Sequence, residues 1–114
     1  MSRDLSFLLD IWQAAHKIEK LIENVSQEEF VQDEMRHAAV IYQLIVVGEA
    51  AKRISNEFRQ QNPAVPWKQM AGMRDVLIHS YDTIDLGLVW EAATQSIPTL
   101  IDQIEPLLPS IDEQ

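Results

Sequence analysis

The architecture of this chain depends on one long apolar segment, Ala38-Ala39-Val40-Ile41-Tyr42-Gln43-Leu44-Ile45-Val46-Val47-Gly48-Glu49-Ala50-Ala51. Its apolar residues cover much of the circumference of a helix, whereas a helix at a protein surface has a single apolar stripe. We therefore expect a long helix of about residues 34–61 that lies at the centre of a bundle or at a contact between subunits.

The spacing of apolar residues also predicts the neighbours of this central helix. A first amphipathic helix is expected over roughly residues 4–24. Ser26 and Glu29 have the spacing of a capping box, which indicates a short helix or turn before the central helix. Pro66 suits the first turn of another helix, which should end at about Ser80.

The last helix is expected to begin at Asp85, a residue type that caps helix N-termini, and Pro98 predicts a kink or break within it. The chain as a whole, residues 1–114, is predicted to be a single all-α domain. Its architecture should be an up-and-down bundle of four to five helices.

The composition limits the class of protein. The chain has 114 residues and no cysteine, so it has no disulfide framework and no thiolate metal site, and a reducing compartment suits it. Its longest apolar run is too short to cross a bilayer, and its first residues lack the pattern of a signal peptide. We expect a cytoplasmic protein that makes no membrane contact.

The net charge of −9 disfavours a nucleic-acid ligand at first sight, because phosphate contacts dominate such affinities. The charge is unevenly distributed, however. Residues 1–34 hold eight acids and three bases, and residues 85–114 hold six acids and no Lys or Arg. Residues 35–84 hold six bases and four acids, which makes them the only net-positive part of the chain. An anionic ligand is permitted there.

This basic part contains Arg74, His79 and Tyr81 within one short stretch. Arginine fits phosphate oxygens with a planar fork of donors, and histidine can accept and return a proton near neutral pH. Together these two residue types are the minimum needed to cleave a phosphodiester bond without a metal ion. From spacing alone, the alternative of a solvated helix end with a chance histidine and tyrosine is equally favoured.

On one ideal helix, Arg74 and His79 would lie about 140° apart, whereas Arg74 and Tyr81 would lie within about 20° of each other. Arg74 and His79 therefore do not share a face. Either the helix is distorted, or the site is completed across a dimer axis, and we favour the dimer because two copies supply both residues twice around one cleft. The carboxylate of Asp75 or Asp82, each about one turn from His79, could fix the imidazole tautomer.

From Phe30 onward the sequence resembles the HEPN superfamily and, within it, the HepT-like branch of toxins. The motif of that branch is an arginine, four to six residues and then His-x-Tyr, and here it stands as Arg74, four residues, His79, Ser80 and Tyr81. The surrounding blocks match as well: Val47-Gly48-Glu49-Ala50-Ala51-Lys52-Arg53-Ile54, Val65-Pro66-Trp67 and Ala71-Gly72-Met73-Arg74-Asp75.

The resemblance implies a HEPN-like homodimer with the motif helix at the dimer cleft. It also implies a metal-independent endoribonuclease, the toxin of a toxin–antitoxin pair, which cleaves tRNA or mRNA and needs no cofactor. Arg74 and His79 would be catalytic, with Asp75, Ser80 and Asp82 in support.

The partner implied by the resemblance is an MNT-type nucleotidyltransferase antitoxin that adds AMP to Tyr81. Adding phosphate beside Arg74 would occupy its donors and block the cleft. The alternative is a non-catalytic helical module that binds the nucleotidyltransferase or a nucleotide through the same surface.

Three other features allow alternative interpretations. The residue after the motif arginine is commonly a polar amide in this family, and here Asp75 could pair with Arg74 and weaken its hold on phosphate. Gly48 could let two helices approach closely, with Glu49 paired to a base, although a role for Glu49 in the site stays open. Glu34 and His37 have the spacing of a di-iron ligand pair, but a second copy is missing, which favours a solvated helix face.

Overall fold

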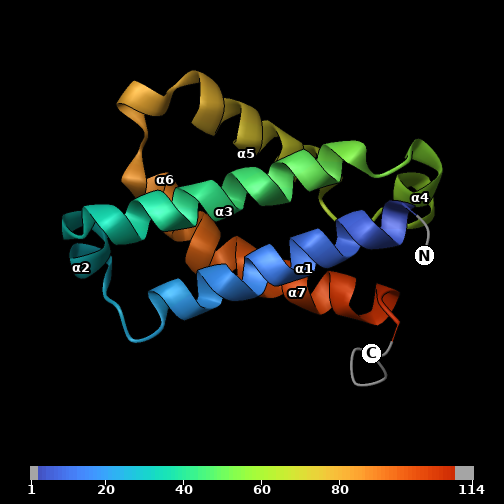
Figure 1. The fold of residues 1–114 in the computed structure, drawn as a ribbon, viewed down its shortest axis with the longest axis horizontal. Helices are drawn as coiled ribbons and strands as arrows, with labels where there is room; N and C mark the ends of the chain where they lie inside the picture. Colours follow the sequence, from blue (N-terminus) through green and yellow to red (C-terminus); the bar gives the residue numbers. More distant parts are fainter. Residues whose placement is uncertain (1–2, 110–114) are drawn as a thin grey trace.

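The computed structural model describes residues 3–109, and helices make up nearly all of this part of the chain (Figure 1). The longer helices are α1 (Arg3–Ile22), α3 (Glu34–Arg53), α5 (Trp67–His79) and α7 (Ile97–Ile104), and the shorter ones are α2 (Gln27–Gln32), α4 (Asn56–Gln61) and α6 (Leu86–Glu91). The prediction of an all-α, HEPN-like bundle is confirmed. None of the helices in residues 3–109 is long and apolar enough to span a membrane.

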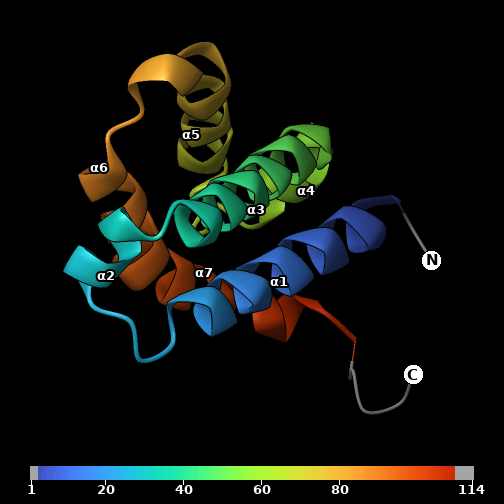
Figure 2. The same cartoon turned by 60° about the vertical axis from the view of Figure 1, so that its left-hand side comes forward.

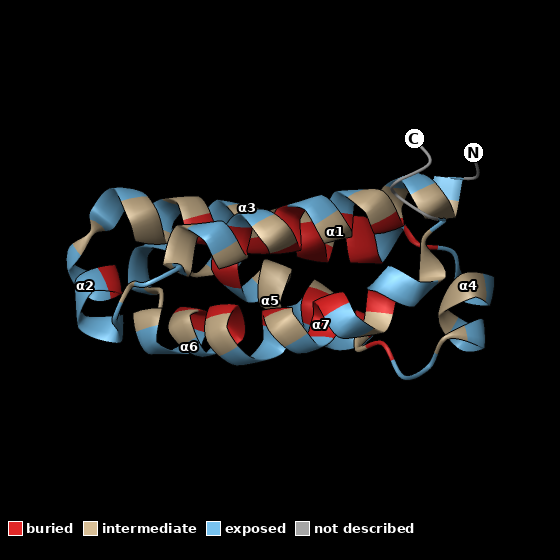
Figure 3. Cartoon of the chain, turned by 90° about the horizontal axis from the view of Figure 1, so that it is seen from below, coloured by how far each residue is buried: buried red, intermediate tan, exposed pale blue. Residues whose placement is uncertain are grey.

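The central position predicted for the apolar segment is confirmed. Helix α3 has its most extensive contacts with α1 and α5, which lie on opposite sides of it in Figures 1 and 2. Its side chains at Val40, Leu44 and Val47 are buried in the core. Figure 3 shows that the buried positions of the other helices also face this interior.

The prediction that the central helix continues to residue 61 is wrong, because α3 ends at Arg53. Ile54 is extended, with φ −64° and ψ 137°, and Ser55 caps a separate helix, α4. The carboxylate of Asp4 accepts hydrogen bonds from the Ser55 amide at 2.8 Å and from its hydroxyl at 2.7 Å. These bonds satisfy groups that a continuous helix would otherwise use, so the chain turns at Ser55.

The other predicted helix starts are confirmed. Ser26 and Glu29 make both reciprocal bonds of a capping box, and the Asp85 side chain accepts from the amides of Gly87 and Leu88. Pro66 stands at the N-cap of α5.

The irregularity predicted around Pro98 takes the form of a π-helical turn, Ala92–Ser96, between α6 and α7. The amide of Ile97 bonds to the carbonyl of Ala92, five residues earlier, so the turn is wider than an α-helical one. Proline has no amide hydrogen, and its ring crowds the preceding turn of an ordinary helix. The wider turn accommodates Pro98 while the last helix continues to Ile104.

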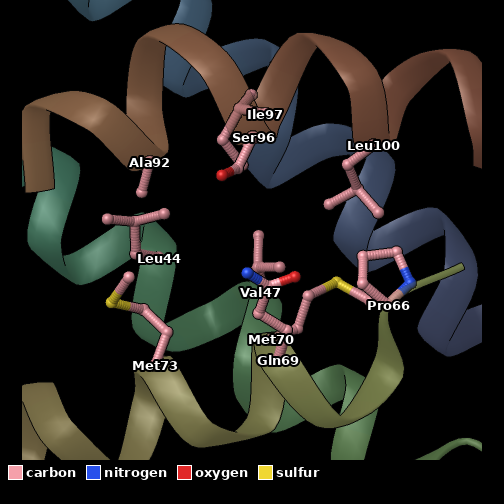
Figure 4. A pocket seen from close by; sticks show the side chains of 10 residues that line it. All are labelled: Leu44, Val47, Pro66, Gln69, Met70, Met73, Ala92, Ser96, Ile97 and Leu100. Atoms are coloured by element: carbon pink, nitrogen blue, oxygen red, sulfur yellow. The ribbon is translucent and has the colours of Figure 1, made fainter. Parts of the chain in front are cut away.

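A small apolar cavity separates α5 from this last helix (Figure 4). It has a volume of about 70 Å³ and is lined by Leu44, Val47, Pro66, Gln69, Met70, Met73, Ala92, Ser96, Ile97 and Leu100. Among the described helices, α5 has extensive contacts with α3 alone. The position of α5 therefore depends on how it packs against α3.

Candidate active site

Helix α5 approaches α3 closely at Gly48. A Cβ atom on Gly48 would lie 2.3 Å from the Cβ of Arg74 and 2.6 Å from the carbonyl oxygen of Met70. Both distances are well inside van der Waals contact, so only glycine permits this approach. The predicted role of Gly48 is confirmed, and its consequence is that the stem of Arg74 lies directly against the backbone of α3.

The guanidinium of Arg74 lies between two carboxylates. Its Nη1 donates to Asp75 Oδ1 at 3.0 Å, and its Nε lies 3.1 Å from Glu49 Oε2, as an ion pair without the alignment of a hydrogen bond. The Arg74 side chain is 23% exposed. The predicted pairings, of Asp75 with Arg74 and of Glu49 with a base, are both confirmed.

Two further cations extend this network. Lys52 Nζ lies 3.4 Å from Asp75 Oδ1, and Arg53 Nη2 lies 3.3 Å from Glu49 Oε1. Three bases thus alternate with two carboxylates where α3 and α5 meet. The hydrogen bond from Arg74, with further help from Lys52, holds the pKa of the Asp75 carboxyl below its usual value.

His79, the last residue of α5, is exposed, and its Nδ1 lies 2.8 Å from the backbone carbonyl oxygen of Asp75. A carbonyl oxygen can only accept a hydrogen bond, so Nδ1 carries the proton. In the neutral imidazole, Nε2 is then the atom with a free lone pair, which is the state that a general base requires.

The suggestion that the carboxylate of Asp75 or Asp82 could fix this tautomer is wrong, because the contact of the imidazole is with a backbone carbonyl. The Asp75 carboxylate binds Arg74 and Lys52 instead, and its backbone carbonyl holds the imidazole. Within residues 3–109, the Asp82 side chain has no hydrogen bond or ion pair. A backbone carbonyl oxygen has two lone pairs, so the Asp75 carbonyl can accept a bond from an imidazole one turn later.

Tyr81 lies outside the helix that carries Arg74. The Ser80 amide bonds to the Val76 carbonyl and closes α5, and a 3-10 turn, Tyr81–Thr83, follows. The angle of about 20° between Arg74 and Tyr81 assumed that the helix continues. The predicted common face of Arg74 and Tyr81 is therefore not present in the structure. Tyr81 is 79% exposed.

Helix α5 is regular between Arg74 and His79. The distortion that could bring both side chains to one face is therefore absent from this part of the structure.

Elsewhere, His37 Nδ1 lies 3.2 Å from the Phe30 carbonyl oxygen. No three histidine, aspartate or glutamate side chains in residues 3–109 form a group that could hold a metal ion.

Lys52 and Arg53 were not predicted to belong to the network around Arg74, in which they pair with Asp75 and Glu49. The sequence indicated only that Lys52 and Arg53 lie near Glu49, because residues three and four positions apart share one face of a helix. That spacing shows which α3 residues lie together, but not that Asp75 on another helix meets them.

The fold and this site define an all-α protein that presents an arginine and a histidine from one short helix. A family model described as ribonuclease HepT-like matches residues 11–107. The chain belongs to the HepT-like ribonuclease family, which confirms the resemblance that the motif indicated.

Relatives in three organisms are similar over nearly their whole length. A Methanocaldococcus jannaschii protein provisionally named an RNase is 37% identical over 100 residues, which cover 88% of this chain and 92% of the relative. A Thermococcus cleftensis protein provisionally named ribonuclease HepT is 39% identical over 101 residues, which cover 89% and 92%. A Caldanaerobacter subterraneus protein provisionally named an RNase is 36% identical over 102 residues, which cover 90% and 91%. No solved structure matches this chain significantly.

We predict that Gly48→Ala lowers the free energy of unfolding by about 1–3 kcal/mol, because the new methyl group overlaps a backbone carbonyl and a Cβ that cannot move independently. The matched control is Gly72→Ala in α5, where a Cβ would have nothing within 4 Å. That substitution should stabilise the protein by about 0.5–1 kcal/mol through helix propensity.

Urea denaturation of the three proteins at one concentration measures both effects. If Gly48→Ala proved as stable as Gly72→Ala, the close approach of α5 to α3 would not determine the position of α5.

Proposed function

We propose that this chain is a metal-independent endoribonuclease that cleaves tRNA or mRNA in the cytoplasm, as the toxin of a toxin–antitoxin pair. The observation that carries the proposal is the bond from His79 Nδ1 to the Asp75 carbonyl, which leaves Nε2 free to accept a proton on the same helix that carries Arg74, a residue type that binds phosphate. Membership of a ribonuclease family supports RNA as the substrate.

In the proposed mechanism, His79 Nε2 takes the proton from a ribose 2′-hydroxyl, and the 2′-oxygen attacks the adjacent phosphorus. Arg74 neutralises the charge that develops on the phosphoryl oxygens. The bond to the 5′-oxygen breaks, and that oxygen takes a proton from the His79 of a second copy or from water. The products are a 2′,3′-cyclic phosphate and a 5′-hydroxyl.

The orientation of the two residues supports a homodimer with the motif helix at its cleft. Because α5 is regular, Arg74 and His79 of one chain lie about 140° apart and do not face one phosphate together. The surface around the motif also has exposed apolar side chains, Val76 at 56% and Leu88 at 53%. Burying such side chains against a second copy would stabilise a dimer.

A specific observation favours the alternative of a non-catalytic binding module. Asp75 occupies one donor of Arg74, which opposes phosphate binding, whereas the exposed Tyr81 needs no free arginine to meet a partner. Absence of cleavage by unmodified protein would favour this alternative.

We predict that the protein, with intact mass showing no modification, cleaves RNA in EDTA, and that Arg74→Ala and His79→Ala each reduce the rate by at least about a hundredfold. The readout is the rate of strand cleavage together with detection of the cyclic phosphate end. His16→Ala, a change on α1, is the control and should cleave at the rate of the unchanged protein. Full cleavage by His79→Ala would contradict the proposed mechanism.

A mixture of the two inactive variants tests whether the site is shared between chains. In a mixed dimer, the Arg74→Ala chain keeps His79 and the His79→Ala chain keeps Arg74, so one site across the axis has both residues. Equal mixing after dissociation should restore about a quarter of the activity, because half of the dimers are mixed and each has one of two sites intact. If cleavage activity is not restored although mixed dimers are shown to form, both residues of each site belong to one chain.

We further propose that an MNT-type nucleotidyltransferase antitoxin adds AMP to Tyr81. The side chain is 79% exposed on the turn directly after α5, and an added nucleotide would bring a phosphate to the residues around His79. Negative charge at that position would repel the RNA backbone from the site.

We predict that incubation with such an enzyme and Mg-ATP raises the intact mass by whole AMP units and abolishes cleavage. Tyr81→Phe should prevent this addition because it lacks the phenolic oxygen. Tyr42→Phe is the matched control, since Tyr42 is the other tyrosine of the chain and is 62% exposed. Unchanged modification of Tyr81→Phe would exclude Tyr81 as the acceptor.

A further inference from the structure

The exposed carboxylate of Asp75 lies where two cations from different helices converge. Arg74 Nη1 of α5 lies 3.0 Å from Asp75 Oδ1, and Lys52 Nζ of α3 lies 3.4 Å from the same oxygen. Two cationic donors aimed at one anionic oxygen form an arrangement that also binds phosphate. Because both nitrogens reach a single oxygen, they are close enough to bind one phosphate group together.

We propose that Lys52 is a second phosphate-binding residue of the site, and that Asp75 occupies the phosphate position until RNA displaces it. This inference rests on the proposed function of the Arg74 site. It assigns the RNA backbone phosphate as the ligand shared by Lys52 and Arg74.

The two carboxylates around Arg74 differ in a way that selects Asp75 as the displaceable one. Glu49 extends from α3, is held by Arg53 at 3.3 Å, and lies at the Nε side of Arg74. Asp75 holds the terminal Nη1, which is the outer part of the fork that meets a ligand. The Asp75 side chain is 49% exposed, and a rotation about its Cα–Cβ bond would move the carboxylate into water without disturbing the core.

Displacement of Asp75 is energetically feasible because exposed ion pairs contribute little to stability. The Lys52 side chain is 42% exposed and therefore accessible to a ligand. A phosphate that enters restores the charge balance at both cations, and its several oxygens can accept from each of them separately. Glu49 would keep the Arg74 stem in place during the exchange.

The place of Lys52 in the fold also favours phosphate binding, although the net charge of the whole chain is negative. It belongs to the last turn of α3, one turn after Gly48, at the level where α5 crosses. The close approach at Gly48 is what lets an α3 lysine reach a residue beside Arg74. A phosphate held there would contact both helices.

The test measures binding rather than cleavage, with a short 2′-O-methylated oligoadenylate that lacks the attacking hydroxyl, in EDTA. Lys52→Ala should weaken binding by about three- to tenfold and should reduce the slope of log affinity against log salt by about 0.7, as expected for one lost contact to single-stranded phosphate. Lys52→Arg should retain most of the affinity and the slope. Lys17→Ala, an exposed lysine of α1, is the matched control and should change neither.

Asp75→Asn keeps the shape of the side chain and removes its charge. It should strengthen binding by about three- to tenfold, because one like charge is removed from beside the phosphate. A merely structural role for Asp75 would not strengthen binding. Unchanged or weaker binding by Asp75→Asn would overturn the displacement that we propose.

Arg74→Ala separates a failure of this inference from a failure of the proposed function. If Arg74→Ala weakens binding and Lys52→Ala behaves like Lys17→Ala, the Arg74 site stands and the role of Lys52 is overturned. If neither Arg74→Ala nor Lys52→Ala weakens binding, both the phosphate site and the inference are overturned. Thermal unfolding of each variant shows whether the fold is retained.

Discussion

The contact between α3 and α5 at Gly48 is the constraint on which the site depends. Because Gly48 has no Cβ, the backbone of α5 at Met70 and the Cβ of Arg74 can lie directly against α3. Helix α5 has no comparable support from the other side, where the apolar cavity separates it from the last helix. The contact therefore fixes both the height of α5 above the core and the direction in which Arg74 leaves it.

The same contact explains why the charges of this region form one network. A partly buried guanidinium needs partners, since a charge removed from water without them is unfavourable. Glu49 meets that need from α3 and Asp75 from α5, and Lys52 and Arg53 balance the two carboxylates. The network carries one more positive than negative charge within a chain of net charge −9. An anion is therefore attracted to this crossing of helices and repelled by the acidic parts of the sequence on either side.

The parts of the fold that follow from local chemistry could be predicted from the sequence. The caps at Ser26 and Asp85 and the irregular turn before Pro98 each depend on residues within a few positions of one another. The break at Ser55 could not be predicted in this way, because the buried Ile54 continues the apolar pattern and the partner of Ser55 is Asp4, 51 residues away. Helix propensity over residues 34–61 favoured continuation, and a tertiary hydrogen bond overrode it.

The candidate site also has features that the local sequence predicts and features that it does not predict. Residue types and spacing identified Arg74 and His79, and an ideal helix correctly placed them on different faces because α5 is regular between them. The same geometry failed for Tyr81, since the helix ends before it, and it could not show that a backbone carbonyl would hold the imidazole. Both errors concern the C-terminal end of α5, where the helical geometry stops and an imidazole can bond to a backbone carbonyl one turn earlier. A helix end is also where a histidine can be exposed and oriented at once, because its own backbone fixes one nitrogen and solvent reaches the other. The position that made the site hard to predict is thus the position that would suit His79 to the proton transfer that we propose.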